Sequence, residues 1–124
     1  MTKKVIQDKL DILFNKQEIL QNRLKNIPFK NQRHRQEFIN ITVLACLDEL
    51  SEILRETAWK NPKYIAGGWK TTQKFKLENY KEEIIDLWHF LINLSISAGL
   101  SSDDLFKRFL NKNEENHERQ NKNY

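Results

Sequence analysis

Two pairs of acidic residues are the residues of this chain best suited to chemistry. Glu49 and Glu52 form one pair, Glu83 and Asp86 form the other, and residues three apart share a helix face. Asp86 stands in the nearly continuous apolar run 84–100, where an unpaired carboxylate is costly. If the two helices pack antiparallel, the four carboxylates converge and repel one another. The pattern therefore predicts a site for a hard divalent cation, Mg²⁺ or Mn²⁺.

Each of these residues also has a plainer interpretation. A single Glu-x-x-Glu pair is common on solvent-exposed helices and predicts no site alone. His89 by itself is more often a hydrogen-bonded core histidine than a ligand, and Gln17 by itself can set the register of a helix bundle. Two acidic pairs, one of them in a strongly apolar helix, favour the site.

Four helical segments are expected to position these residues. Apolar residues at helical spacing predict a first helix that ends before Pro28 and a second over about 33–59. The third helix should start at Thr71 or Thr72 and end before Gly99, and its apolar residues predict that it is covered nearly all round. A fourth should begin at Ser101. The expected core residues are Ile6, Leu10, Leu13, Leu20, Leu24, Phe38, Ile41, Leu44, Leu47, Leu50, Leu54, Tyr80, Ile84, Leu87, Leu91, Leu94 and Ala98.

Composition indicates one all-α domain over residues 1–124. The chain has only three Gly and two Pro, which favours helices over a turn-rich sheet. We expect a four-helix bundle-like core that is completed by dimerisation. The single Cys46 excludes an internal disulfide framework, and the apolar run is interrupted by polar residues, so we expect a cytoplasmic protein without membrane contact. The net charge of +4 is scattered among 17 acids, which makes nucleic-acid binding the least favoured reading.

The spacing of the two acidic pairs resembles the all-α NTP pyrophosphatase superfamily, which includes MazG-like proteins and the dimeric dUTPases. Further motifs resemble the dimeric dUTPase family. "DLWHFL" matches its D-x-x-H-F pattern at Asp86, His89 and Phe90. "LFNKQEIL" resembles its N-terminal helix, in which a glutamine at the position of Gln17 contacts uracil.

Two other segments are similar to the same family. "ETAWK" followed by "GWK" resembles its aromatic–lysine segment, which implies substrate contacts for Trp59, Lys60 and Lys70. Composition alone predicts no ordered structure for the polar C-terminal tail. That tail, "KNEENHERQNKNY", nevertheless resembles the family's C-terminal motif. The resemblance implies that residues 112–124 act as a nucleotide clamp through Lys112, Asn116, Arg119 and Tyr124.

The resemblance implies hydrolysis of dUTP to dUMP and pyrophosphate. Glu49, Glu52, Glu83 and Asp86 would hold two or more Mg²⁺ ions, with Glu49 as the general base. The amides of Gln17 and Asn93 could read the uracil edge, Phe90 could pack on the deoxyribose, and His89 could orient the nucleotide.

Two alternatives stay open at this point. One is a MazG-like nucleoside triphosphate pyrophosphatase with a different or broader base choice. The other is a non-catalytic nucleotide-binding helical module, although such a module has no need of four intact acids.

Overall fold

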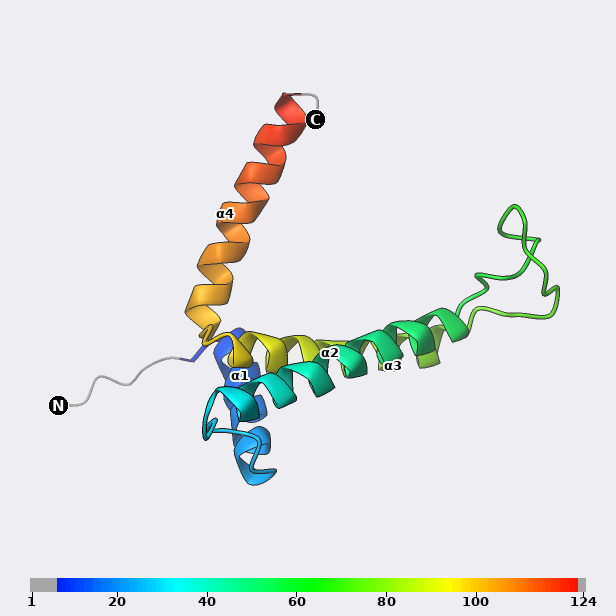
Figure 1. Cartoon of the computed structure of the whole chain (residues 1–124). Coiled ribbons are helices and arrows are strands. Elements are labelled where there is room, and N and C mark those ends of the chain that lie inside the picture. Colours follow the sequence, from blue (N-terminus) through cyan, green and yellow to red (C-terminus); the bar gives the residue numbers. More distant parts are fainter. Residues whose placement is uncertain (1–6, 123–124) are drawn as a thin grey trace.

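The computed structural model describes residues 7–122, and within them the chain forms four α-helices and no strand (Figure 1). The helices are α1 (Lys9–Arg23), α2 (Gln32–Arg55), α3 (Leu77–Ser97) and α4 (Ser102–Asn121). The predicted all-α class is confirmed.

The body of the molecule is built on α2 and α3, which run antiparallel along most of their length, while α1 crosses α3 at one end of this pair (Figure 1). The chain then bends by 100° between α3 and α4, and α4 projects away from the body. Among the described residues, no single helix is long and apolar enough to cross a membrane, and α3 and α4 pass that test only together as this bent pair.

The direction of α4 is set at its first turn. Gly99 ends α3 with a positive φ of 76°, a backbone conformation that glycine adopts without strain. Ser101 and Asp104 then form a capping box that satisfies the first N–H groups of α4. The Ser102 hydroxyl also donates to Asp11 at the start of α1. These bonds hold the beginning of α4 beside α1.

Two expected helix boundaries are wrong. α2 ends at Arg55, before Trp59, and α3 starts at Leu77, beyond Thr71 and Thr72. The reason is a loop, residues 56–76, that is organised by the buried side chain of Asn61. Its amide donates to the backbone carbonyls of Thr71 and Gln73, at 3.3 and 2.8 Å, and these bonds hold residues 71–73 out of a helix.

The composition-based expectation for the C-terminal tail is also wrong. α4 continues as a helix to Asn121. The tail is rich in residues with good helix propensity, and Lys112 pairs with Glu115 one turn later at 3.5 Å. No described residue of α4 is buried, so the helix is sustained by local interactions rather than by packing.

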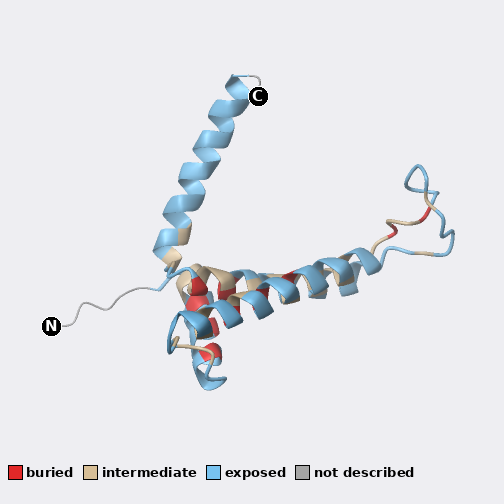
Figure 2. Ribbon diagram, viewed as in Figure 1, coloured by how far each residue is buried: buried red, intermediate tan, exposed pale blue. Residues whose placement is uncertain are grey.

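The core lies where α1 crosses α2 and α3 (Figure 2). Phe14, Phe38 and Ile92 are buried there, together with several polar side chains. The outer apolar residues of α2 are not covered in the single chain, and Leu47 is 58% exposed. Trp88 of α3 is 55% exposed, so the prediction that α3 is covered nearly all round is wrong for one chain. Ile6 lies outside the described residues.

Candidate active site

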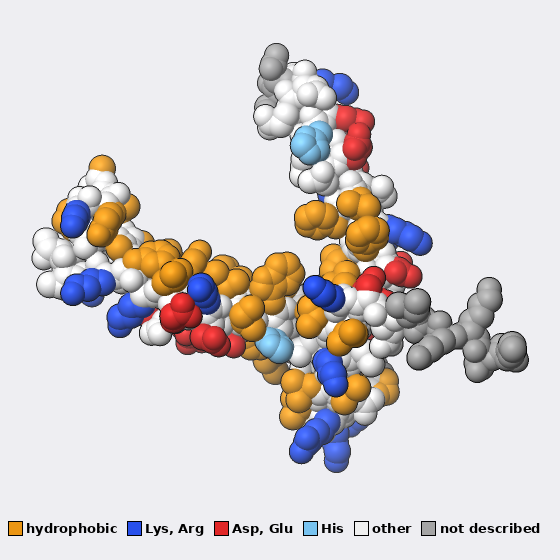
Figure 3. Space-filling view, turned by 180° about the vertical axis from the view of Figure 1, so that it is seen from behind, with side chains coloured by type: hydrophobic (Ala, Val, Ile, Leu, Met, Phe, Trp, Pro, Cys, Tyr) orange, Lys and Arg blue, Asp and Glu red, His pale blue; other side chains and the backbone are white. Residues whose placement is uncertain are grey.

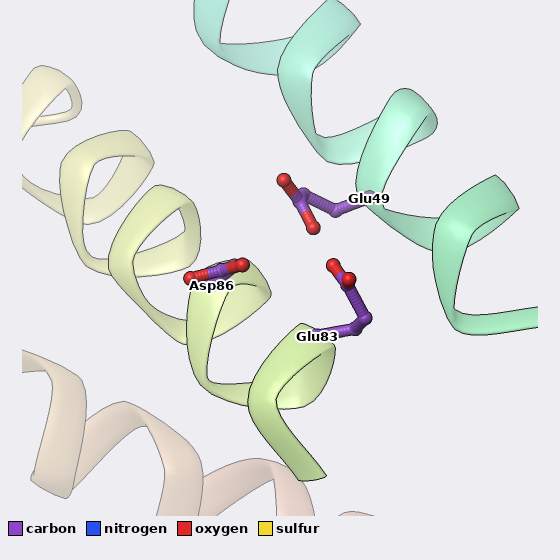
Figure 4. Close-up of side chains that lie close together, drawn as sticks. All are labelled: Glu49, Glu83 and Asp86. Carbon is purple, nitrogen blue, oxygen red and sulfur yellow. The ribbon is translucent and has the colours of Figure 1, made fainter. Parts of the chain in front are cut away.

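Three carboxylates from α2 and α3 meet across the seam between the two helices. Glu49 extends from α2 toward Glu83 and Asp86 of α3 (Figure 4), and one carboxylate oxygen from each lies within 4.8 Å of the others. Antiparallel packing brings the two sequence pairs together because it sets the end of one helix against the beginning of the other. Glu49 and Glu83 are partly buried, whereas Asp86 is exposed to solvent despite its apolar neighbours in sequence.

The negative charge of this cluster has no protein counter-charge. Oε2 of Glu49 and Oε2 of Glu83 are both buried and accept no hydrogen bond. Within residues 7–122, no lysine or arginine forms an ion pair with the three carboxylates. The pKa of Glu49 is raised to about 7, first by burial, then by the nearby carboxyl of Glu83 and by repulsion from Glu52 and Asp86. Orphaned carboxylate oxygens at this density fit a bound cation.

Glu52 lies one turn beyond Glu49 on the same face of α2. The pKa of Glu52 is also raised, mainly by the neighbouring carboxyl of Glu83 and further by partial burial. One turn later Glu56 accepts a hydrogen bond from Asn79 at 3.2 Å, which joins the end of α2 to the start of α3. Glu49, Glu52 and Glu56 therefore form an acidic face of α2 that follows the seam as far as the loop.

A groove opens along the same seam, toward the beginning of α2. It has a volume of about 430 Å³. Thr42 stands seven residues before Glu49, and Asn93 stands seven residues after Asp86. Thr42 and Asn93 therefore each share a helix face with a carboxylate two turns away. The lining residues are Gln21, Leu24, Asn26, His34, Glu37, Phe38, Ile41, Thr42, Phe90 and Asn93.

Gln17 is buried and forms hydrogen bonds with Asn93, which lines this groove, and with the exposed residue His89. Nε2 of Gln17 donates to Oδ1 of Asn93 at 2.7 Å, and its Oε1 lies 2.9 Å from Nδ1 of His89. Gln17 and Asn93 are only 4% and 5% exposed. The structure thus places Asn93 and Phe90 at the groove. Gln17 and His89 do not line the groove: both polar atoms of the Gln17 amide bind protein groups, and the His89 ring contacts Gln17.

The residues of the aromatic–lysine segment gather in the loop 56–76, beyond the carboxylates. The Lys60 ammonium lies 4.6 Å from the ring centroid of Trp59 and 5.1 Å from that of Trp69. The Lys60 carbonyl accepts the N–H groups of Trp69 and Lys70, both at 2.9 Å, while the Lys70 residue remains exposed. The loop therefore presents the Lys60 cation beside two indole rings, beyond the acidic end of the seam.

The C-terminal residues lie apart from this seam. Lys112, Asn116 and Arg119 are exposed on α4, which points away from α2 and α3 (Figure 1). Within one chain the structure does not bring them to the carboxylates. Tyr124 lies outside the described residues.

Sequence reasoning missed two groups of residues. Gln21, Thr42 and Phe38 line the groove, and Asn61 organises the loop. Gln21 stands four residues after Gln17 and shares its helix face, a signal that the sequence contains. Asn61 carries no such signal, because its partners are backbone groups ten and twelve residues away.

Comparison with known proteins places the chain in a family. The model of a family described as dUTPase matches residues 9–102, from the start of α1 to the start of α4. A dCTP pyrophosphatase of Enterobacteria phage T4 is 27% identical over 143 aligned positions, covering 95% of this chain and 84% of that protein. No solved structure matches the chain significantly. The family match spans the carboxylates, the groove and the loop, and the chain therefore belongs to the all-α dUTPase family of nucleotide pyrophosphohydrolases.

Proposed function

We propose that the protein is a dUTP diphosphatase that hydrolyses dUTP to dUMP and pyrophosphate with Mg²⁺. The observation that carries the proposal is the order of features along the α2–α3 seam. A groove with two phenylalanines comes first, the orphaned carboxylates follow two turns later, and the Lys60 loop comes last. The base, the reacting phosphate and the outer phosphates of a deoxynucleoside triphosphate occur in the same order.

Glu49, Glu52, Glu83 and Asp86 are the residues proposed to hold the metal. The fit rests on two buried carboxylate oxygens without donors and on the raised pKa of Glu49 and Glu52. A bound Mg²⁺, or Mn²⁺ in its place, would polarise phosphoryl oxygens and neutralise negative charge, and the number of carboxylates suits two or more ions.

The chain's own contribution to the reaction centres on Glu49. Water attacks the α-phosphorus, a new P–O bond forms, and the bond to the oxygen that bridges to the β-phosphate breaks, which releases pyrophosphate. We assign Glu49 as the group that accepts the proton of the attacking water at a carboxylate oxygen. Lys60, held against the Trp59 ring, is the cation proposed for the outer phosphates.

The proposed role of the C-terminal residues depends on the assembly of two chains. Lys112, Asn116 and Arg119 are proposed to contact phosphates, although α4 points away from the seam of its own chain. We further propose a homodimer, because the outer apolar face of α2 has no cover in the single chain.

A second candidate is cleavage of dCTP. It is favoured by one observation, the name of the phage T4 relative, dCTP pyrophosphatase. Both activities use the same carboxylates and differ only at the base groove.

A nucleotide panel with Mg²⁺ tests the proposal. Purified protein is incubated with dUTP, dCTP, dTTP or UTP, and monophosphate and pyrophosphate are measured. We expect the highest kcat/KM with dUTP and equal amounts of dUMP and pyrophosphate. Faster cleavage of dCTP would establish the second candidate, and no cleavage of any nucleotide would refute both.

Substitution of one carboxylate tests the metal assignment separately. Asp86→Asn should lower kcat by at least about a hundredfold, because positioned charge at a phosphoryl centre commonly contributes that much. The helical circular dichroism should stay unchanged, since Asp86 is exposed. Glu82→Gln removes a neighbouring exposed carboxylate and should retain activity. Wild-type turnover in Asp86→Asn would overturn the assignment.

A further inference from the structure

We propose that the loop between α2 and α3 binds single-stranded nucleic acid. The surface is formed by residues 57–76, at the end of the α2–α3 arm opposite to α1 and α4 (Figure 1). The inference goes beyond the proposed function, because it concerns a partner other than the substrate. It also gives a role to loop residues that no step of the hydrolysis uses.

The loop carries a local excess of positive charge that the composition of the whole chain hides. The chain has a net charge of +4, with 21 basic residues among 17 acidic ones. Residues 57–76 contain no aspartate or glutamate but five lysines, which are Lys60, Lys63, Lys70, Lys74 and Lys76. Within residues 7–122, none of these lysines forms an ion pair with a carboxylate. A cluster of unpaired cations of this kind attracts a polyanion.

Aromatic side chains form a hollow in the same loop. The hollow has a volume of about 490 Å³ and is lined by Thr57, Ala58, Trp59, Tyr64, Ile65 and Phe75. Tyr64 and Phe75 each have more than half of their surface exposed. Trp69 is equally exposed, and its ring packs edge-on against Trp59 with 5.7 Å between the centroids. Rings that line an open hollow offer their surface to a flat group, and a nucleobase is such a group.

The cations and the rings of the loop lie next to each other. The Lys60 ammonium is 4.6 Å from the ring centroid of Trp59, and the Lys63 ammonium is 5.6 Å from that of Tyr64. Figure 3 shows Lys or Arg side chains among hydrophobic ones at this end of the arm. Every unit of a nucleic-acid strand presents a phosphate beside a base, so a cation beside a ring can meet both groups of one unit.

Hydrogen bonds within the loop fix its shape. The buried amide of Asn61 donates to the backbone carbonyls of Thr71 and Gln73. The Lys60 N–H donates to Oε1 of Gln73 at 3.0 Å. Gly68 allows a close approach of the two halves of the loop, because a Cβ at this position would lie 2.7 Å from the carbonyl oxygen of Lys60. A surface that is already formed loses less conformational entropy on binding.

This arrangement favours a single strand over a duplex, a membrane surface or a free nucleotide. In a duplex the bases stack on one another, so their faces are closed to the rings of a protein. Aromatic residues that insert into a membrane project from the surface, whereas the rings of this loop line a hollow. A free nucleoside triphosphate has one base and one phosphate chain, and five lysines within residues 57–76 exceed what it needs.

Binding of a labelled oligonucleotide tests the proposal. Fluorescence anisotropy is measured with fluorescein-labelled oligo(dT) of about 20 nucleotides, which exceeds the usual length of a single-strand site. Mg²⁺ is left out, so that hydrolysis plays no part. We expect a Kd of about 10 μM or lower in about 50 mM NaCl, and this Kd should rise steeply as salt is added.

Two further probes measure the contribution of the bases. An abasic strand of the same length keeps the phosphates but lacks the bases, and it should bind at least about fivefold more weakly than oligo(dT). A duplex of oligo(dT) with oligo(dA) carries more charge for its length. It should nevertheless bind more weakly than oligo(dT), because its bases are already stacked.

Variants of exposed residues separate charge from stacking. Lys63→Gln with Lys74→Gln removes two cations, so the Kd should rise about tenfold or more, and the slope of log Kd against log salt should fall by about 1.4. Tyr64→Ala removes a ring and no charge, so the Kd should rise about fivefold or more at an unchanged slope. Lys9→Gln with Lys107→Gln removes two exposed cations outside the loop and should leave the Kd within about twofold. None of these residues is assigned to the cleavage of dUTP, which should stay as in the wild type.

Several results would overturn the proposal. Absence of binding at low salt would do so, and so would equal affinity for the abasic strand or an equal loss of affinity in the control variant. Displacement of the oligonucleotide by an equimolar amount of dUTP would assign the loop to the substrate site instead. Tighter binding to phosphatidylserine vesicles, lost in the loop variants, would assign it to a membrane surface. If the wild type binds oligo(dT) through the loop but cleaves no nucleotide, the proposed function fails and this inference stands.

Discussion

At the scale of single residues, the environment of Glu49 is unusual for a carboxylate. Burial and three neighbouring carboxyls raise its pKa to about 7, well above its ordinary value of 4.5. A group whose pKa is higher in the folded than in the unfolded state stabilises the fold while it is protonated. That stability is fully present below about pH 4.5 and is lost as the pH rises through 7. Glu52 is shifted in the same direction.

The metal-free protein should therefore become less stable between pH 4.5 and pH 8. Thermal unfolding followed by circular dichroism should give a Tm that falls across this range. Glu49→Gln removes the repelling charge, so its Tm should exceed that of the wild type at pH 8, and the fall with pH should be smaller. Millimolar Mg²⁺ should raise the Tm of the wild type at pH 8 more than that of Glu49→Gln.

Glu82→Gln is the matched control for this experiment, since it removes one exposed charge from the neighbouring turn of α3. It should leave the pH profile close to that of the wild type. A Tm that rises from pH 4.5 to pH 8 in the metal-free wild type would contradict the environment assigned to Glu49.

At the scale of elements, α4 differs from the other three helices because none of its described residues is buried. Its first turn is fixed by the capping box and by the bond between Ser102 and Asp11. Its outer half carries Lys112, Asn116 and Arg119 at steps of four and three residues, which places them on one face. Because this face packs against nothing in the single chain, we expect it to contribute little to folding stability.

Truncation after Asn111 should cost activity far more than stability. We expect kcat/KM for dUTP to fall at least about tenfold, because charge-assisted hydrogen bonds to phosphate would be lost. The Tm should move by no more than a few degrees. The full-length double variant Lys112→Ala, Arg119→Ala should reproduce the loss of activity. Normal cleavage of dUTP by the truncated protein would refute the nucleotide clamp.

At the scale of the whole molecule, the chain exposes an unusual amount of apolar surface. Figure 3 shows hydrophobic side chains along the arm formed by α2 and α3 and along the base of α4. On α2 the exposed residues Val43, Leu47, Leu50 and Leu54 form a stripe on the face away from Glu49. Monomeric proteins rarely leave a continuous stripe of this kind in water. A second copy of the chain would cover the stripe without obstructing the carboxylates.

The protein should therefore be a dimer in solution. Light scattering should give the mass of two 14.9 kDa chains, and Leu47→Glu should shift the mass toward one chain because it places a charge in the covered stripe. The Tm of this variant should also become lower. Thr72→Glu adds the same charge in the exposed loop and should remain dimeric. A monomeric wild type at micromolar concentration would contradict the proposed homodimer.

The sequence by itself determined the helical class and the acidic pairs, because both depend on local spacing. Glu49, Glu52, Glu83 and Asp86 stand at intervals that a helix converts into shared faces, and antiparallel packing brings three of them together. Gly99 and Ser101 likewise marked the junction between α3 and α4, since caps are local features.

Only the tertiary structure decided the partners of the polar residues. Gln17 and Asn93 stand 76 positions apart, and nothing in their spacing tells that their amides bind each other or that the His89 ring contacts Gln17. The loop begins at residue 56 because Asn61 bonds to distant backbone carbonyls, and the 100° bend directs α4 away from the seam. Spacing along a helix fixes a face, but the identity of the group opposite that face depends on how the helices pack.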